Sequence, residues 1–451
     1  MTRNYFGTDG IRGRVGGALI NTEFMLTLGW AIGTVLTDEQ HKTVLIGRDT
    51  RVSGTVLESA LEAGLASAGA VVRTLGIIPT PAVAYLTQSM RAQAGIVISA
   101  SHNPYHDNGV KIFNQQGMKI SDEQELAIEA LLTEPLTMVS SEQMSAMSRL
   151  MYDAQGRYIE FCKGTFPDQL TLEGLKIVID AANGAGHKVA PTIFKELGAT
   201  IVTLGCSPDG FNINEQCGAM STKTLRARVR AEQADIGIAL DGDGDRLLLV
   251  DHKGELVDGD EILAILANEN VSGVRAGVVG TLMSNLGLEQ AMAGLGIEFE
   301  RARVGDRYVL ERLLEKGWTL GGEASGHIID LDYTTTGDGI ISALQVLRVM
   351  QRHKVALSEL KQVMQKRPQI LENIRFSGDI DIINHPETQA IVTQVSERLV
   401  GRGRVLLRLS GTEPLVRVMV EGDDENEVRA AVDEISAVIY SLITNRVEIM
   451  N

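Results

Sequence analysis

The chain has 451 residues, of which 44% are hydrophobic and 22% charged, so it is long enough for about three or four globular domains. Its 58 acidic residues outnumber its 42 lysines and arginines, and the net charge of −16 argues against a general nucleic-acid binder or a protein of anionic membrane surfaces. There is no run of about 20 apolar residues, no apolar signal segment at the start, and the three cysteines are scattered. We therefore expect a cytoplasmic protein.

Three segments of the chain share one pattern of elements. Each begins with a short apolar run and a polar or glycine-containing loop, continues through a stretch of helical periodicity and ends in a β-rich run. The segments are residues 43–76, 175–205 and 276–302. In the first of them, Leu57, Leu61, Leu65 and Ala68 recur at helical spacing. Strand, loop, helix and strand form a βαβ unit, so three such units predict three α/β domains.

A further strand-like run follows each unit and ends in a polar loop. The three sequences are AGIVISASHNP at 94–104, ADIGIALDGDGDR at 234–246 and WTLGGEASGH at 318–327. In open α/β sheets, ligands usually bind at the carboxyl ends of strands. Three equivalent loops with different side chains therefore predict one site shared between the domains.

The first of these loops offers a hydroxyl and nearby basic groups. Ser101 stands at a strand-to-loop corner, where a serine can be a nucleophile, a metal ligand or a cap. Lys111 is a candidate general acid or base if its pKa is lowered, and a solvated lysine otherwise. His102 suits a structural or hydrogen-bonding role better than a metal-ligand role. We take His102 and Arg12, from the polar N-terminal region, as further candidate catalytic residues.

The second loop places three carboxylates at alternate positions, Asp241, Asp243 and Asp245, with glycines between them. Two bare carboxylates about 5 Å apart repel by about 3 kcal/mol at an effective dielectric of ~20, and a cation removes that repulsion. Oxygen ligands without histidine or cysteine point to Mg²⁺ before zinc or copper. An EF-hand does not fit, because Arg246 and His252 stand where glycine and glutamate are needed. The alternative is a solvated acidic turn.

The third loop and the tail carry candidate ligand contacts. Glu323 and Ser325 can accept from and donate to neighbouring sugar hydroxyls. The tail predicts a small α+β domain, with a strand near 370–383, a helix at 386–400, a strand pair at 404–409 and 415–421, and a helix containing residues 428–442. Arginines, hydroxyls and backbone amides around its turn suit a phosphate, and a hairpin with charged edges is the alternative. These residues are Arg408, Ser410, Gly411, Thr412 and Arg417.

Five motifs in this order resemble those of the α-D-phosphohexomutase superfamily. They are FGTDGIRG at 6–13, SASHNP at 99–104, DGDGDR at 241–246, GEASGH at 322–327 and RLSGTEP at 408–414. Further segments look most like the bacterial phosphoglucosamine mutase branch: VGTLMSNLGLE at 278–288, VGDRYVLE at 304–311, TTTGDG at 334–339 and SGTEPLVRVMVEG at 410–422. Ala324 departs from that branch, where we expect a larger residue such as Gln or Asn. The departure bears on sugar preference and not on the reaction class.

The resemblance implies a fold of three similar α/β domains and a C-terminal α+β domain of TATA-binding-protein-like fold around one central cleft. A weakly patterned stretch rich in serine and methionine places the first boundary near residue 150. The expected domains are 1–150 with a phosphoserine loop, 151–253 with a metal-binding loop, 254–367 with a sugar-binding loop, and 368–451 with a phosphate-binding loop.

The resemblance also implies a reaction. Ser101 is expected to carry a phosphoryl group, and one Mg²⁺ per chain to be held by Ser101, Asp241, Asp243 and Asp245. Glucosamine 6-phosphate and glucosamine 1-phosphate would interconvert through glucosamine 1,6-bisphosphate, which turns round in the cleft, and the product would feed UDP-N-acetylglucosamine and peptidoglycan precursors.

The same resemblance assigns the ligand contacts and partners. Glu323, Ser325 and His327 are expected to hold the sugar, and the phosphate turn of the tail to hold the phosphate that is not reacting. A sugar 1,6-bisphosphate is the expected activator and a phosphosugar the expected partner. We expect a monomer or homodimer, with no nucleic-acid or membrane partner.

Three other functions are open at this point. Phosphoglucomutase or phosphomannomutase activity would keep the mechanism and change the sugar. A phosphatase of the haloacid-dehalogenase type would use an aspartate of DGDGD as nucleophile and release phosphate, but it leaves SASHNP and RLSGTEP without a role. A metal-dependent phosphosugar sensor would bind without turnover and carry no phosphate on Ser101.

Overall fold

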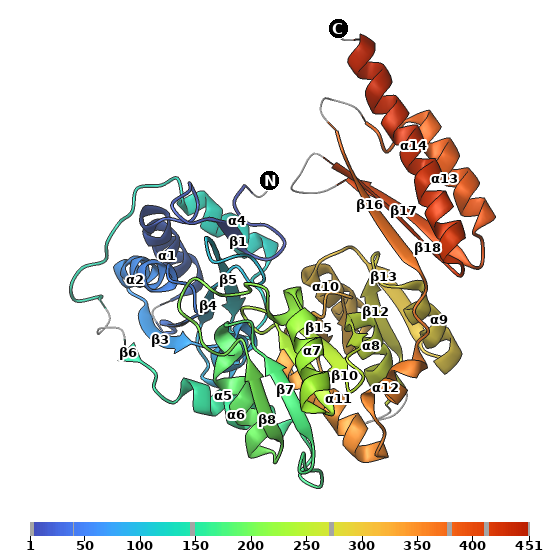
Figure 1. The fold of residues 1–451 in the computed structure, drawn as a ribbon. Coiled ribbons are helices and arrows are strands. Elements are labelled where there is room, and N and C mark those ends of the chain that lie inside the picture. The colour runs from blue at the N-terminus through green and yellow to red at the C-terminus, as the bar shows by residue number, and fades with distance from the viewer. Residues whose placement is uncertain are drawn as a thin grey trace. The chain divides into compact units, whose positions relative to one another are not determined.

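The structure is a computed structural model that describes residues 4–38, 40–144, 149–269, 275–376, 381–409 and 415–449. The chain forms two compact units, one of residues 1–281 and 297–363 and one of residues 282–296 and 364–451. Figure 1 labels their helices and strands. Among the described residues, no helix has the length and apolar character needed to cross a membrane.

The first sheet has the strand order β1-β5-β4-β2-β3-β6. Its strands are β1 (Ile11–Arg14), β2 (Thr43–Arg48), β3 (Val71–Ile77), β4 (Ala94–Ile98), β5 (Asp107–Asn114) and β6 (Arg149–Leu150). The four strands β2, β3, β4 and β6 are parallel, and β1 and β5 run antiparallel to their neighbours. Its helices are α1 (Thr22–Leu36), α2 (Gly54–Ser67), α3 (Thr80–Ser89) and α4 (Asp122–Leu131).

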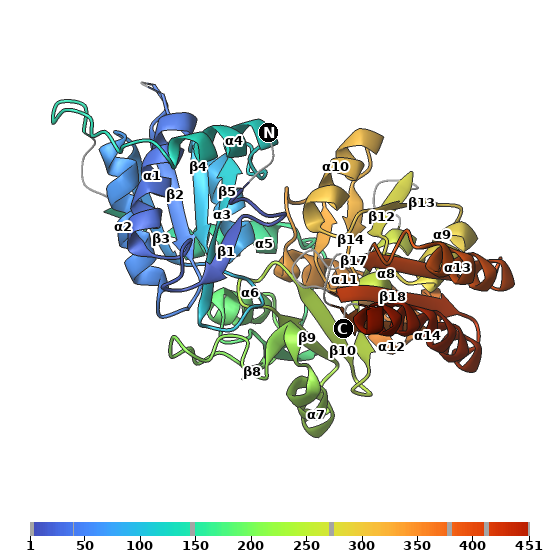
Figure 2. The ribbon, with the colours of Figure 1, turned by 90° about the horizontal axis from the view of Figure 1, so that it is seen from above.

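Alternating side chains bury both faces of this sheet. Val44 and Ile46 point to one face and belong to a core cluster that includes Leu61 of α2. On the other face α3 packs closely, since a Cβ on Gly47 or Gly95 would collide with side chains of that helix. Figure 2 shows α1 and α2 on one side of these strands and α3 on the other. The sheet is therefore the middle layer of an α/β/α sandwich.

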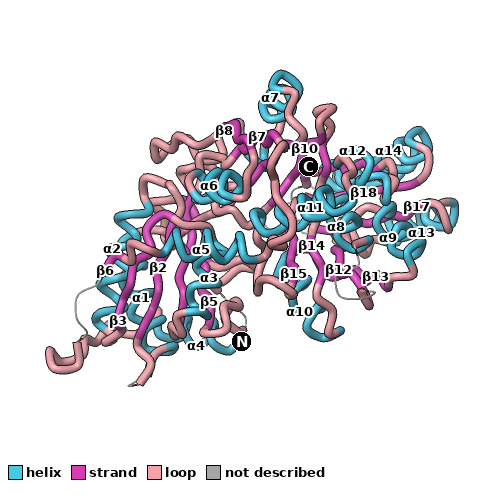
Figure 3. Tube along the Cα trace, turned by 90° about the horizontal axis from the view of Figure 1, so that it is seen from below, coloured by secondary structure: helices cyan, strands magenta, loops and turns pink. Residues whose placement is uncertain are grey.

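The second sheet has the order β11-β10-β9-β7-β8. Its strands are β7 (Lys176–Asp180), β8 (Thr200–Leu204), β9 (Ile236–Leu240), β10 (Leu247–Asp251) and β11 (Leu256–Val257), and its helices are α5 (Ala154–Gly164), α6 (Val189–Glu196) and α7 (Lys223–Glu232). Strands β7, β8 and β9 are parallel, while β10 pairs antiparallel with β9. Figure 3 shows β7 beside β8.

The third sheet has the order β13-β12-β14-β15, in which only β15 is antiparallel. Its strands are β12 (Gly277–Thr281), β13 (Glu298–Ala302), β14 (Leu320–Gly322) and β15 (Ile328–Asp330). The helices of this part are α8 (Gly259–Asn268), α10 (Asp306–Lys316), α11 (Gly339–His353) and α12 (Leu357–Leu360). The described part of the first unit also contains three short 3₁₀ helices, Ala185–His187, Gly218–Met220 and Lys361–Val363.

The predicted βαβ repeats are confirmed in all three sheets. The pairs β2 and β3, β7 and β8, and β12 and β13 are parallel, and a helix connects each pair. The three polar loops also occupy equivalent places, because each joins the last parallel strand to the antiparallel strand that follows it. These loops join β4 to β5, β9 to β10 and β14 to β15.

The second unit contains a three-stranded antiparallel sheet of order β16-β18-β17. Its elements are α9 (Leu286–Leu295), β16 (Gln369–Arg375), α13 (Pro386–Arg398), β17 (Gly403–Leu409), β18 (Leu415–Gly422) and α14 (Glu425–Ile449). Figure 1 shows α13 and α14 together on one face of the sheet. The α+β prediction for the tail is confirmed, but the expected strand at 370–383 is too long. It ends at Arg375, and residues 382–384 form a turn in which Asp381 accepts from the Asn384 amide.

Candidate active site

The loop after β4 holds Ser101 in a backbone conformation that non-glycine residues rarely adopt. The φ angle of Ser101 is +50° and its side chain is buried. The Ser101 amide donates to Ser99 Oγ at 2.9 Å, and Ser99 Oγ donates to Asp49 Oδ2 at 2.5 Å. Strained backbone of this kind persists where the surroundings hold it and is common at functional sites.

A buried arginine shapes the same loop from beneath. Arg51 has no exposed side-chain surface, and its Nε donates to Asp49 Oδ2 at 2.8 Å. Its two Nη groups donate to four loop carbonyls, those of Ser101, Asn103, Pro104 and Asp107. A second side chain, Asn214, donates to the carbonyls of Ser101 and Asn103 at 2.8 and 3.1 Å. The loop is therefore held from both sides by donors to its backbone.

The DGDGDR loop lies directly against this serine. Ser101 Oγ donates to Asp241 Oδ2 at 2.6 Å. Gly242 permits the approach, because a Cβ there would lie 2.5 Å from the Ser101 carbonyl oxygen. The structure thus brings together two loops that are 140 residues apart in the chain.

The three aspartates form a cluster that fits a divalent cation. One carboxylate oxygen from each of Asp241, Asp243 and Asp245 lies within 4.8 Å of the others, and all three residues are buried. The Oδ1 atoms of Asp243 and Asp245 are buried without a hydrogen-bond partner among the described residues. Burial raises the pKa of Asp241 well above its usual value, and the charges of Asp245 and Asp243 raise it further. These carboxylates suit a hard cation such as Mg²⁺.

Lys111 supplies the positive charge at this cluster. Its Nζ lies 2.9 Å from Asp243 Oδ2, 2.8 Å from Asp245 Oδ2 and 3.1 Å from Asp9 Oδ2. Burial alone lowers the pKa of Lys111, but the charges of the three aspartates raise it well above its usual value. An acid–base role for Lys111 requires a lowered pKa, and this arrangement raises it instead. Here the ammonium acts as a counter-ion.

Two other predicted catalytic residues lie close to the cluster. Arg12, on β1, forms an ion pair with Asp9, and its pKa is raised because the aspartate charges outweigh its desolvation. His102 Nδ1 lies 3.3 Å from Ser101 Oγ. Burial lowers the pKa of His102 to about 4, with Arg246 and Arg12 adding to the shift. The imidazole is therefore neutral at physiological pH.

The loop between β14 and β15 approaches the aspartates from the third sheet. His327 is buried, with Nδ1 3.7 Å from Asp245 Oδ1 and Nε2 3.5 Å from Asp306 Oδ2. Burial lowers its pKa, but the neighbouring carboxylates raise it to about 9, so the imidazole is positively charged. Glu323 Oε1 accepts from the Gly305 amide at 3.0 Å, and Ser325 is exposed. The predicted sugar-binding residues thus adjoin the aspartate cluster through His327.

The predicted phosphate turn belongs to the second unit. Arg408 on β17 stands directly opposite Arg417 on β18 in the strand register, so both side chains lie on one face of the antiparallel sheet. Nε of Arg417 is buried without a hydrogen-bond partner among the described residues. The remaining predicted members, Ser410, Gly411 and Thr412, lie outside the described residues.

The site contains polar residues that the sequence did not indicate. Thr80 Oγ1 donates to Asp243 Oδ2 at 2.6 Å. Lys119 Nζ bridges Asp9 Oδ1 and Asp306 Oδ2, each at 2.6 Å. Asp9 and Asp306 stand in the FGTDGIRG and VGDRYVLE segments, which pointed to them indirectly. Thr80 and Lys119 carry no local signal, because their neighbours come from distant parts of the chain.

Four family models match the chain in domain order. All are described as phosphoglucomutase/phosphomannomutase: α/β/α domain I at residues 3–137, domain II at 156–254, domain III at 258–367 and the C-terminal domain at 347–438. A curated relative from Coxiella burnetii (strain Dugway 5J108-111), a phosphoglucosamine mutase, is 57% identical over 97% of this chain and 99% of its own length.

Solved structures show the same fold over nearly the whole chain. A phosphoglucomutase/phosphomannomutase family protein from Burkholderia thailandensis superposes with a TM-score of 0.82 at 25% identity, covering 98% of each chain. The Aspergillus fumigatus N-acetylphosphoglucosamine mutase, solved with GlcNAc-6P and magnesium, has a TM-score of 0.65 at 17% identity over 97% of this chain and 96% of its own. Its likeness shows the fold alone.

The equivalent loops of three similar α/β domains thus surround one buried serine and carboxylate cluster, and a smaller α+β domain follows them. The chain belongs to the phosphoglucomutase/phosphomannomutase family of phosphohexomutases. The predicted resemblance and fold class are confirmed. The domain boundaries near 150, 253 and 367 stay predictions, as do the roles of individual site residues.

Proposed function

We propose that this enzyme is an isomerase that interconverts glucosamine 6-phosphate and glucosamine 1-phosphate. The observation that carries the proposal is the likeness to curated phosphoglucosamine mutases, which extends over 97% of the chain at 57% identity. A second such relative, from Pectobacterium carotovorum, is 57% identical over 96% of the chain. The product would feed UDP-N-acetylglucosamine and peptidoglycan precursors, and the enzyme would work in the cytoplasm as a monomer or homodimer.

Ser101 is the proposed phosphoryl carrier. Its hydroxyl donates to Asp241 at 2.6 Å and has the neutral His102 imidazole 3.3 Å away, so acceptors for its proton are in place. A phosphoryl group brings a charge of about −1.5 to −2 at neutral pH. Lys111, together with Arg12 and Arg246, offers cations around the position that this group would take. The serine would give its phosphoryl group to O1 of the sugar and regain the 6-phosphoryl group after the bisphosphate turns round.

The aspartate cluster is the proposed site of one Mg²⁺ per chain. The ligands would be Asp241, Asp243 and Asp245, with a phosphoryl oxygen on Ser101 completing the set. When bound, the ion would neutralise negative charge on the moving phosphoryl group. The two aspartate oxygens that have no hydrogen-bond partner among the described residues support this assignment.

Binding of the substrate is assigned to two further groups of side chains. Glu323, Ser325 and His327 would hold the sugar hydroxyls, and a sugar 1,6-bisphosphate would act as activator. Five residues of the tail would hold the phosphate that is not reacting: Arg408, Ser410, Gly411, Thr412 and Arg417. The face shared by Arg408 and Arg417 supports this role, because two guanidinium forks can bind one phosphate.

The test is conversion of glucosamine 6-phosphate in Mg²⁺ with a trace of glucose 1,6-bisphosphate, comparing wild type, Ser101→Ala and Ser59→Ala. Ser59 is exposed on α2 and serves as the matched control. We expect turnover in the wild type and in Ser59→Ala, and its loss in Ser101→Ala. Mass spectrometry should find phosphate on the Ser101 peptide after incubation with the bisphosphate.

The alternatives give different results in the same experiment. Faster turnover of glucose 1-phosphate or mannose 1-phosphate would keep the mechanism and change the substrate. Net release of inorganic phosphate would favour a phosphatase with an aspartate nucleophile. Full activity in Ser101→Ala would refute the phosphoserine mechanism.

A further inference from the structure

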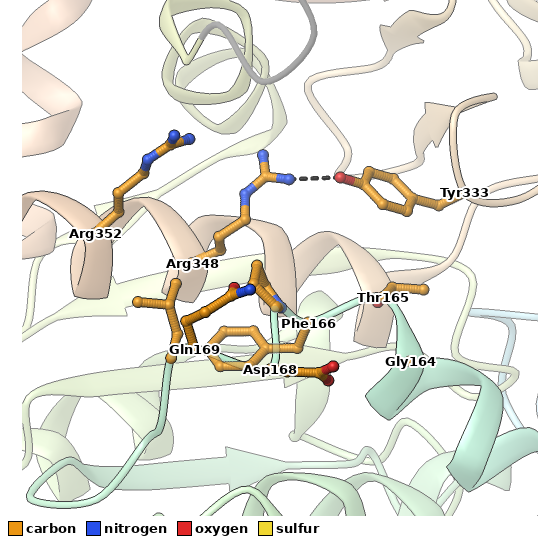
Figure 4. Close-up of a pocket in the computed structure, with 10 residues that line it drawn as sticks. Gly164, Thr165, Phe166, Asp168, Gln169, Tyr333, Arg348 and Arg352 are labelled. Carbon is orange, nitrogen blue, oxygen red and sulfur yellow. Dashed lines mark hydrogen bonds between the residues drawn. The ribbon is translucent and has the colours of Figure 1, made fainter.

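A cavity lies away from the serine and aspartate cluster, within the first unit. Its volume is about 550 Å³, and it is lined by residues 164–170 after α5, by Tyr333 and by Arg348 and Arg352 of α11. Figure 4 shows the two arginines rising from the same side of α11, with Tyr333 facing Arg348. None of these lining residues belongs to the reaction site described above. The volume falls in the usual range for pockets that bind small molecules.

Arg348 is a buried cation that has no counter-ion among the described residues. The residue is only 4% exposed, and its one hydrogen bond among the described residues runs from Nη1 to the Tyr333 hydroxyl. Its Nε is buried without a partner, and no described carboxylate lies within ion-pair distance of its guanidinium. Buried arginines are ordinarily paired, because an unmatched charge away from water is costly. An anion in this cavity would supply the missing partner.

The rest of the lining indicates what kind of anion fits. Arg352, one helical turn after Arg348, adds a second guanidinium, which is half exposed and donates to Glu269 Oε1 at 2.8 Å. Asp168 is the acidic residue of the lining, and it is exposed. Phe166 and Leu170 are apolar residues of the same lining. The cavity therefore combines a fork for a phosphate or carboxylate with a surface for an apolar or aromatic body.

We propose that the cavity between residues 164–170 and α11 is a second ligand site, which binds a phosphorylated organic molecule of nucleotide size through Arg348 and Arg352. The Tyr333 hydroxyl, already directed at Arg348, would contact the same anionic group. The ring or apolar part would lie against Phe166 and Leu170. This site is independent of the proposed mutase reaction.

The test is calorimetric titration of the full-length protein, without Mg²⁺, using three probes. Uridine diphosphate carries both the anion and the ring, pyrophosphate the anion alone, and uridine the ring alone. We expect one saturable site for uridine diphosphate, weaker binding of pyrophosphate and none of uridine. Adding glucose 1,6-bisphosphate should leave the uridine diphosphate isotherm unchanged. Abolition by the bisphosphate would place the nucleotide in the reaction site and overturn the proposal.

Variants identify the site. Arg348→Gln should weaken uridine diphosphate binding at least about tenfold, since it removes the buried partner of the anion. Gln169 lines the cavity and is exposed, so substitutions there should not disturb folding. Gln169→Glu should weaken binding about two- to threefold and Gln169→Lys should strengthen it by a similar factor. Arg157→Gln, at an exposed arginine of α5 outside the cavity, should bind as wild type does.

Two further results would overturn the proposal. One is the absence of saturable binding of both uridine diphosphate and pyrophosphate. The other is equal affinity in the Gln169→Glu and Gln169→Lys proteins, which stands as a test even if Arg348→Gln fails to fold. Thermal melting of each variant shows whether a lost affinity reflects lost structure.

Discussion

The position of Lys111 predicts that Mg²⁺ can replace its charge. The Nζ atom lies 2.8–2.9 Å from carboxylates of Asp243 and Asp245, and the lysine side chain is only 2% exposed. At an effective dielectric of ~20, each contact is worth about 6 kcal/mol before desolvation is subtracted. Removing one partner from a buried ion pair costs about 3–5 kcal/mol in measured cases. We therefore expect Lys111→Met to lose about that much stability when no divalent cation is present.

Mg²⁺ should restore much of the stability that Lys111→Met loses. A cation present at 100 times its Kd stabilises the folded state by about 2.7 kcal/mol. At about 1.4 °C per kcal/mol for a unit of this size, the melting temperature of Lys111→Met should fall by about 4–7 °C in chelator and regain about 4 °C with Mg²⁺. The wild type should gain less, because its ammonium already neutralises the aspartates. The assay is thermal melting in chelator and in Mg²⁺.

Lys119→Met is the matched control. Lys119 is also a largely buried lysine, but it pairs with Asp9 and Asp306 and not with the three-aspartate cluster. It should lose stability in chelator and gain no more from Mg²⁺ than the wild type does. An equal Mg²⁺ shift in all three proteins, or a Lys111→Met protein as stable as wild type in chelator, would refute the reasoning.

Three further predictions follow from buried groups. Burial and two acidic neighbours raise the pKa of Asp241, so this side chain must lose a proton to bind a cation. The affinity for Mg²⁺ should therefore rise by up to about tenfold per pH unit below that pKa. Calorimetry in two buffers of different ionisation enthalpy should detect the released proton, and binding that does not depend on pH would contradict this prediction. Arg51→Lys should lower the free energy of unfolding by about 3 kcal/mol in chemical denaturation and reduce turnover, because lysine cannot donate to all four loop carbonyls. The control Arg48→Lys alters a partly exposed pair with Glu58 and should cost about 1 kcal/mol or less. Equal costs in the two variants would show that the hydrogen bonds of Arg51 to the loop are not what stabilises it. Burial raises the pKa of Asp338 to about 6, above about 3.9 in the unfolded chain, so the wild type loses stability as the pH rises between those two values. Between about pH 4 and pH 7, Asp338→Asn should lose about 3 kcal/mol less stability than the wild type does. Parallel plots of stability against pH for the two proteins would show that the pKa of Asp338 is not raised.

The fold could be predicted from the sequence because its signals are local. Apolar runs of four to six residues before glycine-rich or polar loops mark the parallel strands, and residues such as Leu57, Leu61 and Leu65 mark the buried stripe of a helix. The order of the repeats therefore determined three α/β domains. The tail strand was predicted too long, because hydrophobic alternation continues past Arg375 while the chain turns at 382–384 before α13.

For the candidate site, too, the sequence indicated some features and left others open. Ser101, the three aspartates and Glu323 stand in short motifs whose residue types indicate a chemistry, so the sequence alone made them candidate site residues. Their meeting point followed from the equivalent positions of the loops in a repeated fold. What the sequence could not supply was the protonation state of each group.

The tertiary structure decided the electrostatics, because charges act through space and not along the chain. Lys111 was a candidate base by its sequence position, yet three carboxylates around its ammonium raise its pKa. His327 and His102 have the same side chain and opposite pKa shifts. Burial, with nearby arginines, lowers the pKa of His102, whereas the carboxylates around the buried His327 outweigh its burial and raise its pKa. Arg51, Thr80 and Lys119 join the site through partners that are 50 or more residues away. Residue types and their order determined the fold and the candidate reacting groups, and the packing of distant segments determined which of those groups carry charge.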